Sequence, residues 1–419
     1  MTDVHMLGNG VRVVADPVPG FETFALSVVA GRGARCEDER RAGWAHLLEH
    51  MVFKGAGDRS ARDIVERIEA AGGSINAATG YERTSFQVRS LAGGLALGLE
   101  TVADMMLRPT LDPADLAQEV GVIAQEIAEA ADTPDDFVFE MAQGAAFAGQ
   151  PLGRPVLGAE ASIGAADPAT LGDWRAALYA PDQIVVSAAG NIDPDELLGL
   201  AERLFGDLAP NSGVAATPAA FVGGPAAEAR RLEQAHLVLF LPGVGAVDPD
   251  YFAARIFAEA LGGGMSSRLF QEARERLGLA YAIDAFAESY QDTGLIGVYA
   301  GCAAKDAAAL AEVVAREFAK LADAPGEAEL ARAKTQLKAA LFMARESLAA
   351  RAEQAAAQLL VFDRLLPTAE VAQRVDAVGA ADLRRLAGRL TAPKLAAPAV
   401  LGPSRALAAA DAFHRAMFG

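Results

Sequence analysis

The chain has 419 residues, of which 52% are hydrophobic and 22% are charged, and its formal net charge is −18 at pH 7. This length predicts at least two domains with sizeable cores, and the composition is that of an ordinary globular protein. The acidic balance argues against nucleic-acid binding, which requires a basic face. The negative charge would attract cationic peptides if the acids line a cavity. The alternative is an acidic surface that only keeps the protein soluble.

The cysteines and the apolar runs indicate the cellular compartment in which the protein is expected. Cys36 and Cys302 are the only cysteines and lie far apart in the sequence, which argues against a disulfide framework. The first ten residues lack the basic and apolar regions of a secretory signal peptide. No uninterrupted apolar run reaches the roughly 18 residues that a membrane span needs. We therefore expect a cytoplasmic protein without a membrane partner.

Strand and helix patterns alternate through the first half of the chain. Short runs of alternating polarity predict strands, and apolar residues three or four apart, bounded by caps and glycines, predict helices. In chain order we expect strands at 10–16 and 23–30, helices at 43–53 and 60–70, strands at 74–79 and 82–88, a helix at 95–106, a helix that starts at Asp112-Pro113, a helix at 168–179, a strand at 184–189 and a helix at 193–205.

The helix expected at 43–53 carries the sequence HLLEH at residues 46–50. Residues four apart lie on one face of a helix, so His46 and His50 can reach the same metal ion. Glu49 lies on the flank of that face, where it can contact a metal-bound water without being a ligand. The order His-x-x-Glu-His is the inverzincin signature. The alternative is a buried helix whose histidines are satisfied by other groups.

A catalytic zinc site usually has three protein ligands plus water, so a third ligand is expected from another element. The helix that starts at Asp112-Pro113 offers Glu119, Glu126 and Glu129. Glu119 and Glu126 are seven residues apart and lie on nearly one face, beside an apolar stripe. A carboxylate so close to buried residues needs a partner, although a solvated helix edge would show the same pattern. The residues alone do not choose among the three acids.

The strands expected at 74–79 and 82–88 form a hairpin around Gly80 and Tyr81. Small side chains at Ala77 and Ala78 would leave the backbone of an edge strand open. Such an edge can pair with an extended peptide, although an ordinary hairpin has the same sequence pattern.

The second half of the chain repeats the order of elements in the first. Residues 207–227 are rich in Pro, Gly and Ala without periodicity, which predicts an interdomain linker. We expect an α+β fold with two duplicated domains, each a mostly antiparallel sheet with helices packed on one side. We place these domains at 1–208 and 230–419, with the linker at 209–229. In the second half we expect strands at 235–240, 278–283 and 294–300 and helices at 251–261, 266–276, 306–322 and 327–348.

The expected repeat is not chemically symmetric. The glycines at 262–264 can be aligned with residues 53–55. This alignment places Arg255, Ala258 and Glu259 opposite the first histidine, the glutamate and the second histidine of the HLLEH motif. The second domain therefore lacks an equivalent metal site. It carries instead Arg274 and Tyr281, seven residues apart, after the glycine-rich turn. By itself an Arg and Tyr pair at this spacing predicts no specific function.

Together, these motifs resemble the M16 peptidases, a family that includes pitrilysin, insulin-degrading enzyme and the mitochondrial processing peptidase. The resemblance rests on HLLEH at 46–50, on Glu126 after 75 intervening residues, and on Arg274 with Tyr281. It covers both halves of the chain and matches the short, two-domain branch of the family. It implies duplicated domains of the M16 and LuxS-like metallohydrolase type.

The resemblance also implies roles for the residues of the first domain. In the family pattern, the acid at the place of Glu126 is the third zinc ligand, and the acid at the place of Glu119 supports the site. One Zn²⁺ per chain would then be held by His46, His50 and Glu126, with Glu49 as the general base. We read Glu119 as a residue that orients a ligand.

For substrate binding, the resemblance points to Asn76 and Ala77, which match the family residues that bind the peptide backbone. Arg274 and Tyr281 match a pair that grips the carbonyl side of the substrate. In four-domain relatives the zinc lies on the first domain and this pair on the fourth. A two-domain chain is therefore expected to form a homodimer whose site is shared between chains, although a different M16 subunit would also serve as the partner.

The function that follows from the motifs and the resemblance is zinc-dependent endopeptidase activity on short, unfolded peptides inside a chamber. One alternative is a non-catalytic scaffold or partner subunit, because some relatives lack one of the two motifs. Another is a different metallohydrolase, such as an amidase that acts on non-peptide substrates. The presence of both the HLLEH motif and the Arg and Tyr pair favours the peptidase.

Overall fold

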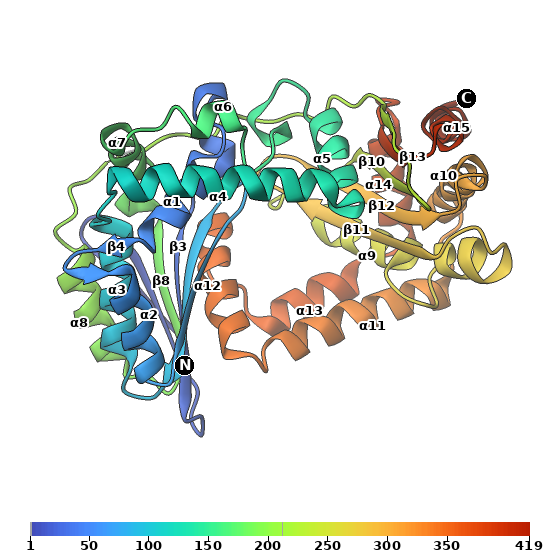
Figure 1. Ribbon diagram of the computed structural model, residues 1–419. Helices are drawn as coiled ribbons and strands as arrows, with labels where there is room; N and C mark the ends of the chain where they lie inside the picture. Colours follow the sequence, from blue (N-terminus) through green and yellow to red (C-terminus); the bar gives the residue numbers. More distant parts are fainter. Residues whose placement is uncertain (1, 212) are drawn as a thin grey trace. The chain divides into compact units, whose positions relative to one another are not determined.

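The computed structural model describes residues 2–211 and 213–419, which divide into two compact units (Figure 1). Unit 1 comprises Met1–Ala128, Pro155–Thr217 and Met343–Leu365. Unit 2 comprises Glu129–Arg154, Pro218–Phe342 and Leu366–Gly419. The units therefore differ from the contiguous domains expected at 1–208 and 230–419, because each includes a segment from the other half of the sequence.

Unit 1 is built on a six-stranded sheet with the order β1-β2-β8-β3-β7-β6. All neighbours are antiparallel except β2 and β8, which are parallel. The strands are β1 (Asp3–Met6), β2 (Arg12–Pro17), β3 (Thr23–Ala30), β6 (Ser74–Thr79), β7 (Thr84–Leu91) and β8 (Ile184–Gly190). A short hairpin of β4 (Gly55–Ala56) and β5 (Arg59–Ser60) follows the first helix.

Helices cover both faces of this sheet. One face contributes Phe24, Leu26 and Val28 of β3 to the main core, where most of the helices pack. The opposite face has a smaller apolar cluster that α12 (Leu348–Phe362) covers with Ala356 and Leu359 (Figure 1). The other helices of unit 1 are α1 (Trp44–Val52), α2 (Ala61–Ala70), α3 (Leu95–Leu107), most of α4 (Pro113–Asp132), α6 (Glu160–Ile163), α7 (Pro168–Leu178) and α8 (Pro194–Phe205).

Unit 2 has a five-stranded sheet with the order β11-β12-β10-β13-β9. This order matches β6-β7-β3-β8-β2 of unit 1, and in both sheets the last pair is parallel while the others are antiparallel. The strands are β9 (Ala226–Ala229), β10 (Ala235–Pro242), β11 (Ala282–Ser289), β12 (Gly294–Cys302) and β13 (Ala397–Gly402). The shared order confirms the duplicated α+β fold.

The helices of unit 2 repeat the arrangement seen in unit 1. Leu237 and Leu239 of β10 face the main core, and Phe240 on the opposite face contacts Phe139 of α5 (Pro134–Ala146). The remaining helices are α9 (Tyr251–Gly262), a π-helix at Phe270–Arg276, α10 (Ala307–Asp323), α11 (Glu327–Ala344), α13 (Thr368–Ala377), α14 (Ala380–Thr391) and α15 (Ala408–Phe418). The expectation of helices on one side is therefore incomplete, since both sheets are apolar on two faces.

Three expected elements of the second half differ from the structure. The helix expected at 327–348 ends at Ala344, because the side chain of Ser347 caps a new helix by accepting a hydrogen bond from the Ala350 N–H. The strand expected at 278–283 begins only at Ala282, after a turn in which Gly278 has φ +62°. The helix expected at 266–276 is a π-helix over its last seven residues. None of the helices in the described parts of the chain is long and apolar enough to cross a membrane.

Candidate metal centre

The helix α1 is held at its N-terminus by a buried carboxylate. Glu37 is 2% exposed, and its side chain accepts hydrogen bonds from the N–H groups of Gly43 (2.8 Å) and Ala45 (2.6 Å). These donors have no partner within a helix, and a negative charge there also interacts favourably with the helix dipole. Gly43 has φ +92°, and a Cβ on it would lie 2.6 Å from the carbonyl oxygen of Leu157. Both features fix where the HLLEH segment begins.

The apolar residues of α1 set the direction in which the motif points. Leu47, Leu48 and Met51 are fully buried in the core of unit 1. His46 and His50 lie on another side of the helix and keep a small exposed fraction, 12% and 17% of their side chains. Burial of one stripe therefore turns both imidazoles out of the core, as the spacing predicts.

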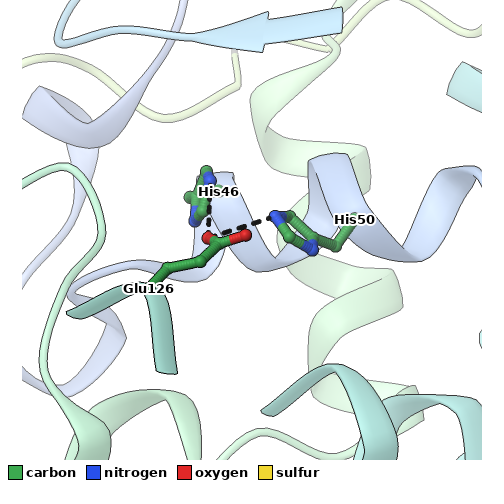
Figure 2. A group of neighbouring side chains, drawn as sticks. All are labelled: His46, His50 and Glu126. Carbon is green, nitrogen blue, oxygen red and sulfur yellow. Dashed lines mark ion pairs between the residues drawn. The ribbon is translucent and has the colours of Figure 1, made fainter. Parts of the chain in front are cut away.

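Glu126 of α4 lies opposite the two histidines (Figure 2). Its Oε2 atom is 3.9 Å from Nε2 of His46 and 3.6 Å from Nε2 of His50. One ligand atom from each residue lies within 4.8 Å of the other two. All three residues belong to unit 1, so one compact unit contains the whole group.

The group fits a metal ion in both geometry and charge state. Ligands about 2.0–2.1 Å from a tetrahedral zinc ion lie roughly 3.3 Å from one another, close to the separations observed. Burial, and then the charge of His50, lowers the pKa of His46 to about 4. Its imidazole is therefore neutral at pH 7, which is the form that binds metals. Nδ1 of His46 is buried and has no hydrogen-bond partner among the described residues.

Glu119 contacts His50 at Nδ1, whereas Glu126 lies nearest to Nε2 of the same ring. It is 3% exposed, its Oε2 atom lies 3.0 Å from Nδ1 of His50, and its Oε1 atom lies 2.5 Å from Nζ of Lys54. Burial alone would raise the pKa of this carboxyl, but the hydrogen bonds from Lys54 and His50 outweigh it and the pKa lies below its ordinary value. This geometry separates Glu119 from Glu126, a choice that the residues alone left open.

Glu49 directly precedes His50 on α1 and is not one of the three residues whose ligand atoms lie together. Its Oε2 atom is buried and has no hydrogen-bond partner in the described part of the chain. Tyr179, at the end of α7, is also buried with a hydroxyl that lacks a partner among the described residues. Burial, and then the negative charge of Glu49, raises the pKa of Tyr179 well above its ordinary value. Sequence analysis did not single out Tyr179, because a lone tyrosine after a helix carries no signal.

The other predicted site residues lie in different surroundings. Asn76 and Ala77 are on β6, the edge strand of the unit 1 sheet, with Asn76 exposed and Ala77 buried. Arg274 and Tyr281 belong to unit 2. The Arg274 guanidinium lies 4.6 Å from the centre of the Phe270 ring, and Tyr281 is 58% exposed directly before β11. The roles assigned to these four residues remain predictions.

A pair of histidines and a glutamate that share a metal-sized space, with a further carboxylate alongside, is an arrangement typical of metal-dependent hydrolases. Comparison with known sequences leads to the family. Residues 12–160 match the family described as insulinase (peptidase family M16), and residues 166–337 match the peptidase M16 inactive domain. The chain therefore belongs to peptidase family M16.

Relatives and solved structures agree with this assignment. An uncharacterized zinc protease of Rickettsia bellii is 34% identical over 96% of this chain and 98% of its own length. One of Bacillus subtilis is 32% identical over 91% of this chain and 94% of its own. A protease of Helicobacter pylori shares the fold, with a TM-score of 0.88 at 22% identity, over 96% of this chain and 99% of that one.

Proposed function

We propose that this chain is a zinc-dependent endopeptidase that hydrolyses short, unfolded peptides. The observation that carries the proposal is the convergence of His46, His50 and Glu126 on one small space, next to Glu49, whose buried Oε2 atom has no hydrogen-bond partner among the described residues. The names of the relatives support zinc as the metal and peptides as the substrates.

In this proposal, different residues of unit 1 bind the metal, transfer the proton and orient a ligand. His46, His50 and Glu126 would hold the zinc ion, which when bound would supply Lewis acidity and lower the pKa of water at the site toward about 7. Glu49 takes up a proton at its carboxylate and returns it to the leaving amine. Its Oε2 atom is buried and has no competing hydrogen bond in the described part of the chain, so this carboxylate stays available for proton transfer. Glu119 orients the imidazole of His50 through the contact at Nδ1.

The edge strand β6 provides the peptide-binding surface. In the described part of the chain its only strand partner is β7, so its outer backbone groups can bind an extended peptide as an added strand. Asn76 and Ala77 lie at the middle of this edge. Strand addition requires an extended backbone, so unfolded peptides are the preferred substrates. In the proposal these peptides are bound inside a chamber.

The test is hydrolysis of a quenched fluorescent peptide library, measured together with the zinc content of the same preparation. We expect about one zinc per chain. Hydrolysis should be abolished by a chelator and restored by added Zn²⁺. A preparation that holds zinc but cleaves only non-peptide amides would identify a different metallohydrolase.

A specific observation favours a second candidate, a non-catalytic scaffold or partner subunit. A chain of the Candida albicans complex III shares the fold, with a TM-score of 0.86 at 20% identity, over 99% of both chains. This chain retains both the HLLEH motif and the Arg274 and Tyr281 pair, which favours the peptidase. Absence of hydrolysis from a preparation fully loaded with zinc would instead support the scaffold.

The proposal includes a homodimer in which each site is shared between chains. Arg274 and Tyr281 would come from the second copy and stabilise the negative charge that develops on the substrate carbonyl oxygen. Closed twofold symmetry is the commonest form of homo-oligomer.

Complementation tests the shared site. Glu49→Gln and Tyr281→Phe chains, each inactive alone, are mixed and allowed to exchange subunits. Half of the dimers are then mixed, each with one of two sites intact, so activity should recover to about a quarter of the wild-type value. No recovery after exchange has been demonstrated would show that each chain completes its own site or needs a different partner.

A further inference from the structure

Two sets of polar contacts join α1 and the turn after it to α4, and only one set contains the candidate metal ligands. In the first, His46 and His50 of α1 face Glu126 of α4. In the second, Lys54, two residues beyond the end of α1, contacts Glu119 of α4. Glu119 precedes Glu126 by seven residues on α4, so these two carboxylates lie on about the same face of that helix, and Lys54 contacts Glu119 from the turn that follows α1.

The contacts of Glu119 form a continuous chain from Lys54 to the metal-binding group. Nζ of Lys54 lies 2.5 Å from Oε1, and the other carboxylate oxygen lies 3.0 Å from Nδ1 of His50. Nε2 on the far side of the same ring lies 3.6 Å from Glu126. We propose that Lys54 is a positioning residue, which fixes the Glu119 carboxylate and thereby holds the His50 ring in its metal-binding orientation.

The burial of the pair makes this role physically reasonable. Ion pairs on the surface contribute little, because water competes for both groups and the side chains lose conformational freedom. Here the side chain of Glu119 is 5% exposed and that of Lys54 is 29% exposed. A carboxylate that is bound at both oxygens cannot rotate, so it offers His50 one fixed acceptor. Without Lys54, Oε1 would lose the ion pair that holds it, and the carboxylate would be free to turn away from the ring.

The inference rests on the proposed zinc site, and zinc affinity tests it apart from activity. In Lys54→Met the charge is removed while the length of the side chain is kept. The zinc dissociation constant, measured by competition with a chelator, should rise by roughly 10–100-fold, as expected for the loss of a residue that orients a ligand. Lys54→Arg retains the charge and should recover most of the lost affinity.

Unit 2 offers a matched control. Nζ of Lys320 lies 2.7 Å from Oε1 of Glu317, whose side chain is 7% exposed, and neither residue belongs to the metal-binding group. Lys320→Met therefore removes a lysine from an equally buried glutamate, and zinc affinity should not change. Thermal unfolding of the metal-free proteins verifies that both variants fold. Lys54→Gln replaces Lys54→Met if the latter does not fold.

A double variant tests whether Lys54 acts through Glu119. Because its effect passes through that carboxylate, Lys54→Met should add nothing to the loss of affinity in Glu119→Gln. The visible spectrum of the Co²⁺-substituted protein should shift in the same way for both single variants, because both release the His50 ring. Wild-type affinity in Lys54→Met, or two losses that simply add, would overturn the inference. A wild-type chain that binds no zinc would overturn the proposed function as well.

Discussion

The α-helices that follow the corresponding strands β3 and β10 differ between the two units far more than the sheets do. Five strands of the unit 1 sheet have the same order as the unit 2 sheet, yet α1 carries HLLEH while α9 has Arg255, Ala258 and Glu259 at the places expected for the first histidine, the glutamate and the second histidine. Both helices nevertheless bury an apolar stripe against their own sheet. The comparison shows that apolar packing maintains the duplicated fold, while a few polar residues on the remaining side of a helix determine the chemistry.

The two helices are also fixed differently at their N-termini. In α1 the buried carboxylate of Glu37 binds two backbone N–H groups. At α9 the anchor consists of ion pairs, in which Asp248 contacts Arg389 at 2.7 Å and Asp250 contacts Arg385. The arginine side chains of these pairs are more than half exposed, at 52% and 56%. The helix that carries His46 and His50 is therefore attached through a more buried contact.

The largest effect is expected for Glu49→Gln. Loss of the general base should lower turnover of a quenched peptide by roughly 10²–10⁴-fold. About one zinc per chain should remain, since the three proposed ligands are intact. The corresponding helix of unit 2 supplies the control, because Glu259→Gln should leave turnover unchanged. Loss of zinc from Glu49→Gln would show that Glu49 is a ligand.

The next effect concerns Glu119 and Glu126 of α4. Glu126→Gln should release zinc, because it removes one of three ligands. Glu119→Gln should weaken zinc binding by only about 10–100-fold, because the residue touches His50 and not the metal. Chelator competition and the metal content after dialysis measure both. The assignment fails if Glu119→Gln loses zinc while Glu126→Gln retains it.

The sequence predicts the elements around the metal centre well, because their signals are local. Strands 23–30 and 74–79 match β3 and β6, and the helix expected at 60–70 matches α2, which Ser60 caps by accepting a hydrogen bond from the Asp63 N–H. The HLLEH spacing by itself placed two imidazoles on one face of a helix. The choice of Glu126 came from resemblance, since Glu119 and Glu126 have the same helical periodicity and differ only in which atoms of the histidines they meet.

Features that depend on the tertiary structure could not be predicted in this way. The contact of Lys54 with Glu119 joins the turn after α1 to α4, and nothing in the sequence around Lys54 indicates it. Helix α5 lies in the first half of the sequence but belongs to unit 2, and α12 lies in the second half but belongs to unit 1. No periodicity in the sequence reveals this exchange. Sequence analysis also predicts no element beyond Leu348, where the alanine-rich segments lack clear boundaries.

Stability should respond to the anchor of α1. Glu37→Gln keeps the size of the side chain but removes the charge that binds two N–H groups in a buried setting. We expect a loss of about 1–3 kcal/mol in the free energy of unfolding, the usual cost of impairing hydrogen bonds to a buried charged group. Urea unfolding of the metal-free protein measures it, with Asp38→Asn as a neighbouring exposed control. An unchanged midpoint for Glu37→Gln would mean that the core packing of α1 alone fixes its start.

The smallest effect is expected at the anchor of α9. Arg389→Gln removes the ion pair with Asp248, but the arginine is half exposed, so the free energy of unfolding should fall by less than about 1 kcal/mol at neutral pH. The hydrogen bond from Arg389 lowers the pKa of Asp248 below its ordinary value of 3.8. A carboxyl with a lowered pKa in the folded state contributes stability above its unfolded pKa and loses it as the pH falls through the folded value. The difference between Arg389→Gln and the wild-type protein, measured by urea unfolding, should therefore shrink as the pH falls below about 4. A loss as large as that of Glu37→Gln would show that the two anchors are equivalent and that the exposure of the arginine does not weaken its ion pair. A loss independent of pH would show that the ion pair with Asp248 does not account for the effect.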